Sequence, residues 1–231
     1  MATVVGHSVP PLVAGDKLTR AEFLRRWEAR PEIKNAELIG GMVYRASPVS
    51  AEHSTMETEV GGWLYVYKAA TPGTSSGHNA TTILLNDMPQ PDLNLRILPE
   101  FGGRSFVKGR YLNGIPELLA EICGSSTVHD LHVKLELYRA AGVPEYLTVL
   151  LFEREIRWHV LVDGQCQLLA PDPDGLLRSR IFPGLWLDGN ALLAGNSQRV
   201  LEWLQDGLHS PEHSNFVAAL AARRAANLPS Q

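Results

Sequence analysis

The stretch Leu118-Leu119-Ala120-Glu121-Ile122-Cys123 decides the fold class, because it is an almost wholly apolar run that holds a single carboxylate. Such a run is typical of a strand that is covered on both faces. Ser126 or Thr127 can cap a helix that follows it over 128–141 and ends at Gly142. A buried strand that leads directly into a helix indicates an α/β protein.

Patterns on either side of this block extend the prediction. Thr19 and Glu22 form a capping box ahead of a helix over 20–29, and Ser50 begins a longer helix. The Gly40-Gly41 pair predicts a hairpin between two short apolar runs over 36–44. Further apolar runs predict strands over 81–85, 93–98, 146–152, 156–162 and 165–169. This order of elements predicts an α/β sandwich, with a central mixed β-sheet flanked by helices.

The length of 231 residues fits one domain with extensions. Residues 1–15 contain Pro10 and Pro11 without periodicity and are interpreted as a flexible N-terminal arm, followed by the main domain over 16–195. Residues 196–231 carry helical patterning and form the predicted C-terminal helical tail. Its apolar positions have little core left to cover, which leads us to expect a homodimer; they are Val200, Leu201, Trp203 and Leu204.

Composition narrows the class of protein. The chain is 45% hydrophobic and 20% charged, as an ordinary globular protein is. Its net charge of −4 provides no overall basic field that would attract nucleic acid, so any nucleic-acid function must rest on a local site. The cysteines Cys123 and Cys166 lack a paired spacing and are interpreted as reduced packing residues. Without a secretory signal or an apolar membrane-spanning run, we expect a cytoplasmic protein with no membrane partner.

Glu121 and Lys134 are polar residues in places where polarity costs free energy. A carboxylate in the buried strand needs a cation, a metal ion or a proton, and a structural ion pair would satisfy it equally well. Lys134 falls in the apolar stripe of the following helix, between Leu131 and Leu137. Its stem can cover the stripe while the ammonium group reaches water. The stripe faces the sheet, however, and therefore allows Lys134 to meet Glu121.

Asp92 is a third candidate. It follows Pro91 and begins a strand whose polar positions alternate with Leu93, Leu95 and Ile97. Aspartate after proline is often only a turn residue. Two carboxylates on neighbouring strands with a lysine nearby nevertheless form the set of groups that metal-assisted hydrolysis of a phosphodiester requires, with Mg²⁺ as the oxygen-liganded ion.

Several motifs occur together and in order along the chain. They are Glu37-Leu-Ile-Gly-Gly-Met-Val, Ser47-Pro48, His53, Gln90-Pro91-Asp92-Leu, Glu117-Leu-Leu-Ala-Glu121-Ile, Ser125-Ser126-Thr127, Asp130, Lys134, Tyr138, Ala141-Gly142-Val143-Pro144-Glu145-Tyr146 and Phe182-Pro183-Gly184-Leu185. This pattern resembles the Uma-type restriction endonuclease family of the PD-(D/E)XK nuclease superfamily, over roughly residues 16–195. The resemblance implies a restriction-endonuclease-like sandwich, a Mg²⁺ or Mn²⁺ cofactor, and cleavage of nucleic acid, with DNA as the expected partner.

The resemblance also implies roles for single residues. Asp92 and Glu121 match the two acids and would hold the metal. The superfamily's lysine two residues after the second acid is replaced by Cys123, and Lys134 on the next helix resembles the substitute. Glu37 matches an acid of the first hairpin, and His53 a histidine that would support the site. The block Gly124-Ser125-Ser126-Thr127 and the run Val149-Leu150-Leu151 depart from the family pattern and leave room for a weakly active member.

Each of the other candidates has a plainer alternative. His53 shares an apolar helix face with Met56 and Val60, as a core histidine would, and Glu37 can be a surface acid. His129 and His132 point away from the apolar stripe, which favours a solvated helix face over a metal site. The basic and aromatic segment over 104–111 can contact a phosphate backbone or be a solvated loop.

Two functions follow from the sequence. The first is a metal-dependent endonuclease in which Glu37, Asp92, Glu121 and Lys134 are catalytic. The second is a catalytically degenerate nuclease-fold module that binds nucleic acid or a protein partner. The net charge of −4 and Cys123 favour the module. Lys134 favours the enzyme, because a degenerate protein gains nothing from an ammonium group in an apolar stripe.

Overall fold

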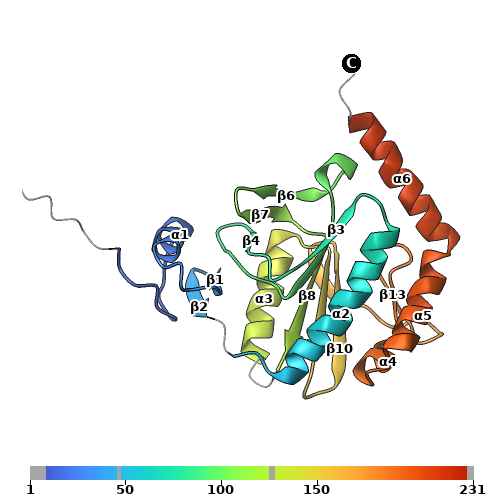
Figure 1. Cartoon of the computed structure of the whole chain (residues 1–231), viewed down its shortest axis with the longest axis horizontal. Coiled ribbons are helices and arrows are strands. Elements are labelled where there is room, and N and C mark those ends of the chain that lie inside the picture. The colour runs from blue at the N-terminus through green and yellow to red at the C-terminus, as the bar shows by residue number, and fades with distance from the viewer. Residues whose placement is uncertain (1–8, 46–47, 125–127, 228–231) are drawn as a thin grey trace, which may run out of the picture.

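The computed structural model describes residues 9–45, 48–124 and 128–227, with side chains from residue 132 onward in the last segment. Its centre is a six-stranded mixed sheet in which β8 and β9 are parallel and the other neighbours antiparallel. The strand order is β11 (Gln165–Leu168), β10 (Glu155–Val162), β9 (Glu145–Leu150), β8 (Leu118–Cys123), β5 (Leu93–Ile97) and β3 (Thr74–His78). The predicted mixed sheet flanked by helices is confirmed (Figure 1).

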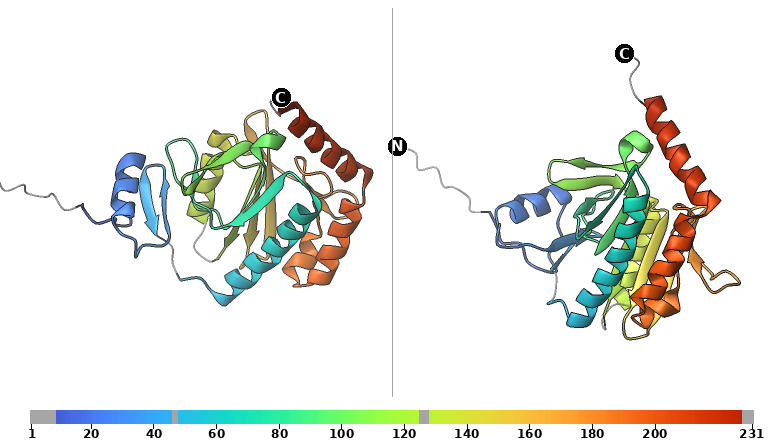
Figure 2. Two further views of the ribbon diagram at one scale, coloured as in Figure 1. Left: turned by 45° about the horizontal axis from the view of Figure 1, so that its top comes forward. Right: turned by 45° about the vertical axis from the view of Figure 1, so that its right-hand side comes forward.

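Helices cover both faces of this sheet. On one face lie α2 (Ala51–Ala70), α4 (Gly189–Leu193) and α5 (Ser197–Leu208), which bury the main apolar core against β5, β8 and β9. On the other face α3 (Val128–Ala141) packs on Leu119 and Tyr146. Figure 2 shows α5 alongside α2, with α6 (Pro211–Asn227) continuing past the sheet towards η1 (Pro99–Phe101). None of the helices in the described ranges is both long and apolar enough to cross a membrane.

The N-terminal part adds a small third cluster beside the sheet. The helix α1 (Arg20–Glu28) packs on the hairpin of β1 (Ala36–Ile39) and β2 (Met42–Arg45), which confirms both predicted elements. Thr19 caps the helix by accepting a hydrogen bond from the Glu22 amide, 3.3 Å. The Glu22 carboxylate does not complete a capping box, because it pairs with Arg25 and Arg26. Through β1 this unit brings Glu37 towards α3.

Contrary to what the sequence led us to expect, the segment over 104–111 is not a loop, although most of its side chains are exposed. These residues form β6 (Arg104–Lys108) and the start of β7 (Tyr111–Ile115), in a sheet with β4 (Thr82–Ile83). The strand β6 lies at the sheet edge and exposes Phe106 and Val107 on opposite faces. No alternation of apolar and polar residues therefore marks it as a strand in the sequence.

Other short elements also differ from the predictions. The polar edge strand β3 and the helix α4 had no sequence signal, and β4 spans only part of the strand predicted over 81–85. A further pair, β12 (Leu177–Arg178) and β13 (Trp186–Leu187), closes the core near α5. In the tail, Val200 and Leu204 are buried in the main core. The apolar surface that motivated the homodimer is thus largely covered within the chain, and both the dimer and the three-part division of the chain stay predictions.

Candidate active site

The two carboxylates come from neighbouring strands. In the antiparallel ladder between β5 and β8, Leu93 lies opposite Ala120 and Leu95 opposite Leu118. Continued by one residue, this register places Asp92 opposite Glu121. Because side chains opposite each other in a ladder point to the same face, both acids lie on the side of the sheet that α3 covers. The predicted adjacency of their strands is confirmed.

Asp92 is anchored to the strand beside it. Its Oδ2 accepts a hydrogen bond from the Ile122 amide at 2.7 Å, and its side chain is 15% exposed. Its Oδ1 accepts no hydrogen bond from the described residues. The hydrogen bond to Ile122 therefore fixes the Asp92 carboxylate, and within the described ranges its second oxygen has no donor.

Glu121 is the most deeply buried acid of this group, with a side chain only 6% exposed. Its Oε1 accepts hydrogen bonds from Lys134 Nζ at 2.9 Å and from the Tyr138 hydroxyl at 3.0 Å. Within the described ranges no donor contacts its Oε2. Burial raises the pKa of Glu121, with Lys134 opposing the rise and Asp92 adding to it. A second positive charge near Oε2 would stabilise the ionised form.

Lys134 links two carboxylates across the cleft. Besides Glu121, its Nζ lies 3.2 Å from Glu37 Oε1, and its side chain is 15% exposed. Burial acts to lower the pKa of Lys134, but the two carboxylates outweigh burial and raise the pKa well above its usual value. The lysine thus remains an ammonium group. Its position matches the predicted contact with Glu121, and its charged end does not lie in bulk water.

Glu37 and His53 complete the set of predicted residues. Glu37 Oε1 also accepts a hydrogen bond from the Gln90 amide at 2.6 Å, so the side chain is held in the cleft. His53 lies in the first turn of α2, and its Nε2 is 3.6 Å from Asp92 Oδ2. The interaction with Asp92 raises the pKa of His53. The histidine is therefore a cleft residue beside an acid.

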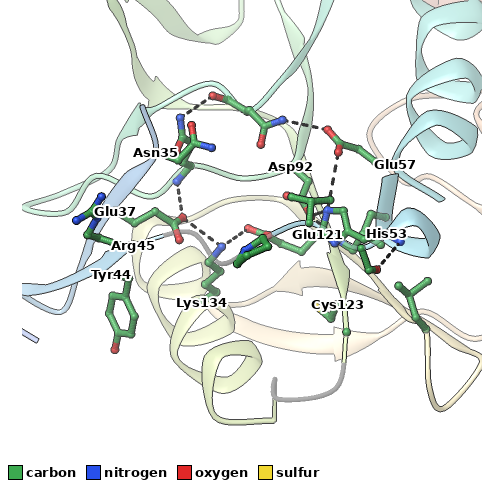
Figure 3. A pocket seen from close by; sticks show the side chains of 18 of the residues that line it. Asn35, Glu37, Tyr44, Arg45, His53, Glu57, Asp92, Glu121, Cys123 and Lys134 are labelled. Atoms are coloured by element: carbon green, nitrogen blue, oxygen red, sulfur yellow. Dashed lines mark hydrogen bonds and ion pairs between the residues drawn. The ribbon is translucent and has the colours of Figure 1, made fainter. Parts of the chain in front are cut away.

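These groups line one cleft of about 570 Å³. Figure 3 shows Lys134 between Glu37 and Glu121, with Asp92 and His53 on the far side of Glu121. The other acidic and basic side chains of the cleft, apart from its tyrosines and Cys123, are Arg45, Glu52 and Glu57. Carboxylates outnumber cationic side chains here, so the cleft without a bound cation would repel a phosphate group.

The structure adds three residues that sequence reasoning did not find. Glu57, Asn79 and Gln90 line the cleft and connect its predicted members by hydrogen bonds. Glu57 could have been found, because it follows His53 by four residues on one helix face. Asn79 and Gln90 each combine one side-chain hydrogen bond with one made by a backbone group, and backbone groups leave no pattern in a sequence. Of the two other histidines considered, His132 is exposed as predicted, and the His129 side chain lies outside the described residues.

The family comparison decides the classification. The model of the Uma2 family, described as putative restriction endonuclease, matches residues 20–190. The chain belongs to the Uma2 family. A crystal structure of a putative nuclease belonging to DUF820, from Anabaena variabilis ATCC 29413, is similar in fold. Its TM-score is 0.56 at 14% sequence identity, over 81% of this chain and 99% of that one. No curated protein sequence matches the chain.

Membership of the Uma2 family makes the donor chemistry of the cleft informative. Within the described parts of the chain, no group of three or more His, Cys, Asp and Glu side chains is arranged to hold a metal ion. Zinc would require such a set, whereas Mg²⁺ is commonly bound by one or two carboxylates and completed by water and substrate phosphate. Asp92 and Glu121 each have an oxygen that accepts no hydrogen bond from the residues the structure describes, so the donor set of this Uma2 site fits a hard divalent ion of the Mg²⁺ type.

Proposed function

We propose that this Uma2 protein is a Mg²⁺- or Mn²⁺-dependent endonuclease that hydrolyses phosphodiester bonds in DNA. One observation carries the proposal: Asp92, just before β5, lies opposite Glu121 on β8, Lys134 contacts Glu121, and each acid has one carboxylate oxygen without a donor among the described residues. An ion bound there would activate water and neutralise charge on the phosphate. A cytoplasmic location and a homodimer stay predictions.

The roles of the residues follow from their contacts. Asp92 and Glu121 would hold the ion through their open oxygens. Lys134 is already charged and would donate a hydrogen bond to a phosphate oxygen, where negative charge increases as water attacks. Glu37 orients Lys134 through Oε1, and its Oε2 accepts no hydrogen bond from the described residues, so it can accept one from water. His53 fixes Asp92 from the side of α2.

The degenerate module is the alternative, and the charge of the cleft restricts what it could bind. Cys123 ends β8 where the superfamily pattern has a lysine, which favours a loss of activity. Without a cation, the excess of carboxylates in the cleft disfavours nucleic acid. A module that has lost its metal would therefore bind a protein partner through this cleft.

A metal titration separates the two functions. We expect calorimetry to detect Mg²⁺ or Mn²⁺ binding to the wild-type protein and a strong loss in Asp92→Asn, with DNA cleavage lost in parallel. Asp163→Asn is the matched control, because Asp163 is an exposed turn residue away from the cleft. If the wild-type protein binds neither ion and cleaves neither DNA nor RNA, the endonuclease proposal is refuted and the non-catalytic module is the remaining function.

A further inference from the structure

Glu57 lines the cleft on the side of α2 (Figure 3). It lies in α2 with its side chain 18% exposed, and its Oε1 pairs with His78 Nδ1 at 3.3 Å and with Asn79 Nδ2 at 3.0 Å. Its Oε2 lies 3.8 Å from His53 Nε2. Glu57 makes no direct contact with Asp92 or Glu121 among the described residues. It therefore reaches the site only through its neighbours.

Asn79 is the first of these neighbours. Its φ of +50° is in the left-handed region, which asparagine tolerates better than most residues. Its amide donates to the Asp92 carbonyl at 2.9 Å, and its own carbonyl accepts from Gln90 Nε2 at 3.0 Å. The side-chain contact with Glu57 thus holds a turn that is bonded to the main chain of Asp92.

The same turn extends to the other side of the cleft. Gln90 donates its side chain to Asn79 and its backbone amide to Glu37 Oε1. Figure 3 shows these contacts as a continuous line from Glu57 over the top of the cleft to Glu37 and Lys134. One acid on α2 is in this way connected to both halves of the predicted site.

Gly61 makes room for the arrangement. A Cβ atom at this position would come within 2.4 Å of His78 Cε1 and 2.7 Å of His78 Nε2. The histidine ring therefore rests directly against the helix, one turn beyond Glu57. Any side chain at Gly61 would displace His78 and its contact with Glu57.

From this geometry we infer that Glu57 is a positioning residue, which holds Asp92 in place through Asn79 and His53. The inference rests on the proposed function, because it assumes that Asp92 binds the metal. Groups that orient metal ligands change metal affinity about 10–100-fold when they are removed, and small displacements of reacting groups reduce rates strongly. The alternative is that Glu57 has only a structural role, in which it connects α2 to β3 through His78.

The test compares Glu57→Ala, Glu57→Gln and the control Glu59→Ala, using Mn²⁺ alone in calorimetry. Glu59 lies on the same helix and has no polar partner in the described ranges. We expect Glu57→Ala to weaken Mn²⁺ binding about 10–100-fold and to lower kcat with little change in KM. Glu57→Gln keeps an acceptor for Asn79 and should restore most of the affinity, while Glu59→Ala should match the wild type.

A second variant tests the same link in case Glu57→Ala does not fold. Asn79→Gly suits the left-handed backbone and keeps the turn, but it removes the side-chain link to Glu57. We expect an unchanged or higher melting temperature together with weakened Mn²⁺ binding. Wild-type affinity in folded Glu57→Ala and Asn79→Gly would overturn the positioning role alone. Absence of Mn²⁺ binding in the wild type would overturn the proposed function, and the positioning role with it.

Discussion

Two glutamates are buried on the neighbouring parallel strands β8 and β9, and they differ in how their charge is satisfied. Glu145, at the start of β9, uses both oxygens: Oε1 accepts from the Arg180 and Ile181 amides, and Oε2 accepts from the Ser179 hydroxyl. Among the described residues, Glu121 on β8 accepts hydrogen bonds only at Oε1, with Lys134 and Tyr138 as donors. The exposed fractions of the two whole residues are similar, 1% for Glu145 and 5% for Glu121. Burial alone therefore does not distinguish a structural acid from a candidate ligand.

The difference lies in the unused oxygens. Glu117 resembles Glu145, because backbone amides of Ile97 and Arg104 engage both of its oxygens. Asp92 resembles Glu121, because the described residues donate to one of its oxygens and not to the other. The open oxygens of Asp92 and Glu121 are not among the fully buried polar atoms that lack a partner in the described residues; both residues line the cleft, where water or a ligand can reach them. Glu117 and Glu145 thus connect chain segments, whereas Asp92 and Glu121 are the proposed metal ligands.

The largest expected effect comes from replacing Lys134 with methionine, which keeps the stem and removes the charge. If Lys134 stabilises the phosphate, cleavage should fall about 10²–10³-fold while the protein stays folded, because a contact made in the transition state is lost. Cleavage rates and melting temperature are measured on the same preparation. If the variant instead loses roughly 3–5 kcal/mol of stability while its folded molecules still cleave, Lys134 has a structural role and not a catalytic one.

This contrast between acids was only partly visible in the sequence. The strand Leu118–Cys123 and the helix Val128–Ala141 match their predicted bounds, because a continuous apolar run and a helical stripe are strong local signals. The meeting of Lys134 with Glu121 followed from the same stripe. The strand β3 was missed because it is polar and lies at the sheet edge, where no apolar face has to be buried.

The site could be predicted only in part, because several of its side chains are held by hydrogen bonds to backbone groups. Nothing in the sequence indicates that the Ile122 amide binds Asp92, or that residues 180 and 181 satisfy Glu145, because every residue except proline carries an amide. Which oxygens remain open depends on these contacts. Residue types and spacing therefore identified the acids of the site, and only the three-dimensional arrangement separated them from the structural acids.

The second prediction concerns the pH dependence of stability. Burial raises the pKa of Glu145 to about 7, against the lowering effect of its hydrogen-bond donors. The folded protein then binds this proton more tightly than the unfolded chain, so the free energy of unfolding should fall as the pH rises from about 4 to about 7. The expected contribution is roughly 3 kcal/mol.

Glu145→Gln should remove this contribution, since glutamine keeps an acceptor but does not titrate. The measurement is urea unfolding of both proteins at several pH values between 4 and 8. The difference between the two proteins isolates Glu145 from Glu121 and Glu117, whose pKa values are also raised by burial. Parallel stability curves for wild type and variant would contradict the prediction.

The smallest expected effects come from a matched pair of hydroxyl deletions, Tyr138→Phe and Ser179→Ala. Each removes one O–H donor from a buried carboxylate, Glu121 in the first variant and Glu145 in the second. Tyr138→Phe should lower stability by about 1 kcal/mol, the usual net value of such a bond. Ser179→Ala should lower it more, because the Ser179 hydroxyl also accepts hydrogen bonds from the Ile181 and Phe182 amides. Only Tyr138→Phe should also change Mn²⁺ affinity and slow cleavage, by less than tenfold, because Lys134 still holds Oε1 of Glu121.

Unfolding and calorimetric titration of both variants provide the comparison. Equal shifts in metal affinity would mean that Glu145 belongs to the same functional network as Glu121, and the distinction by unused oxygens would fail.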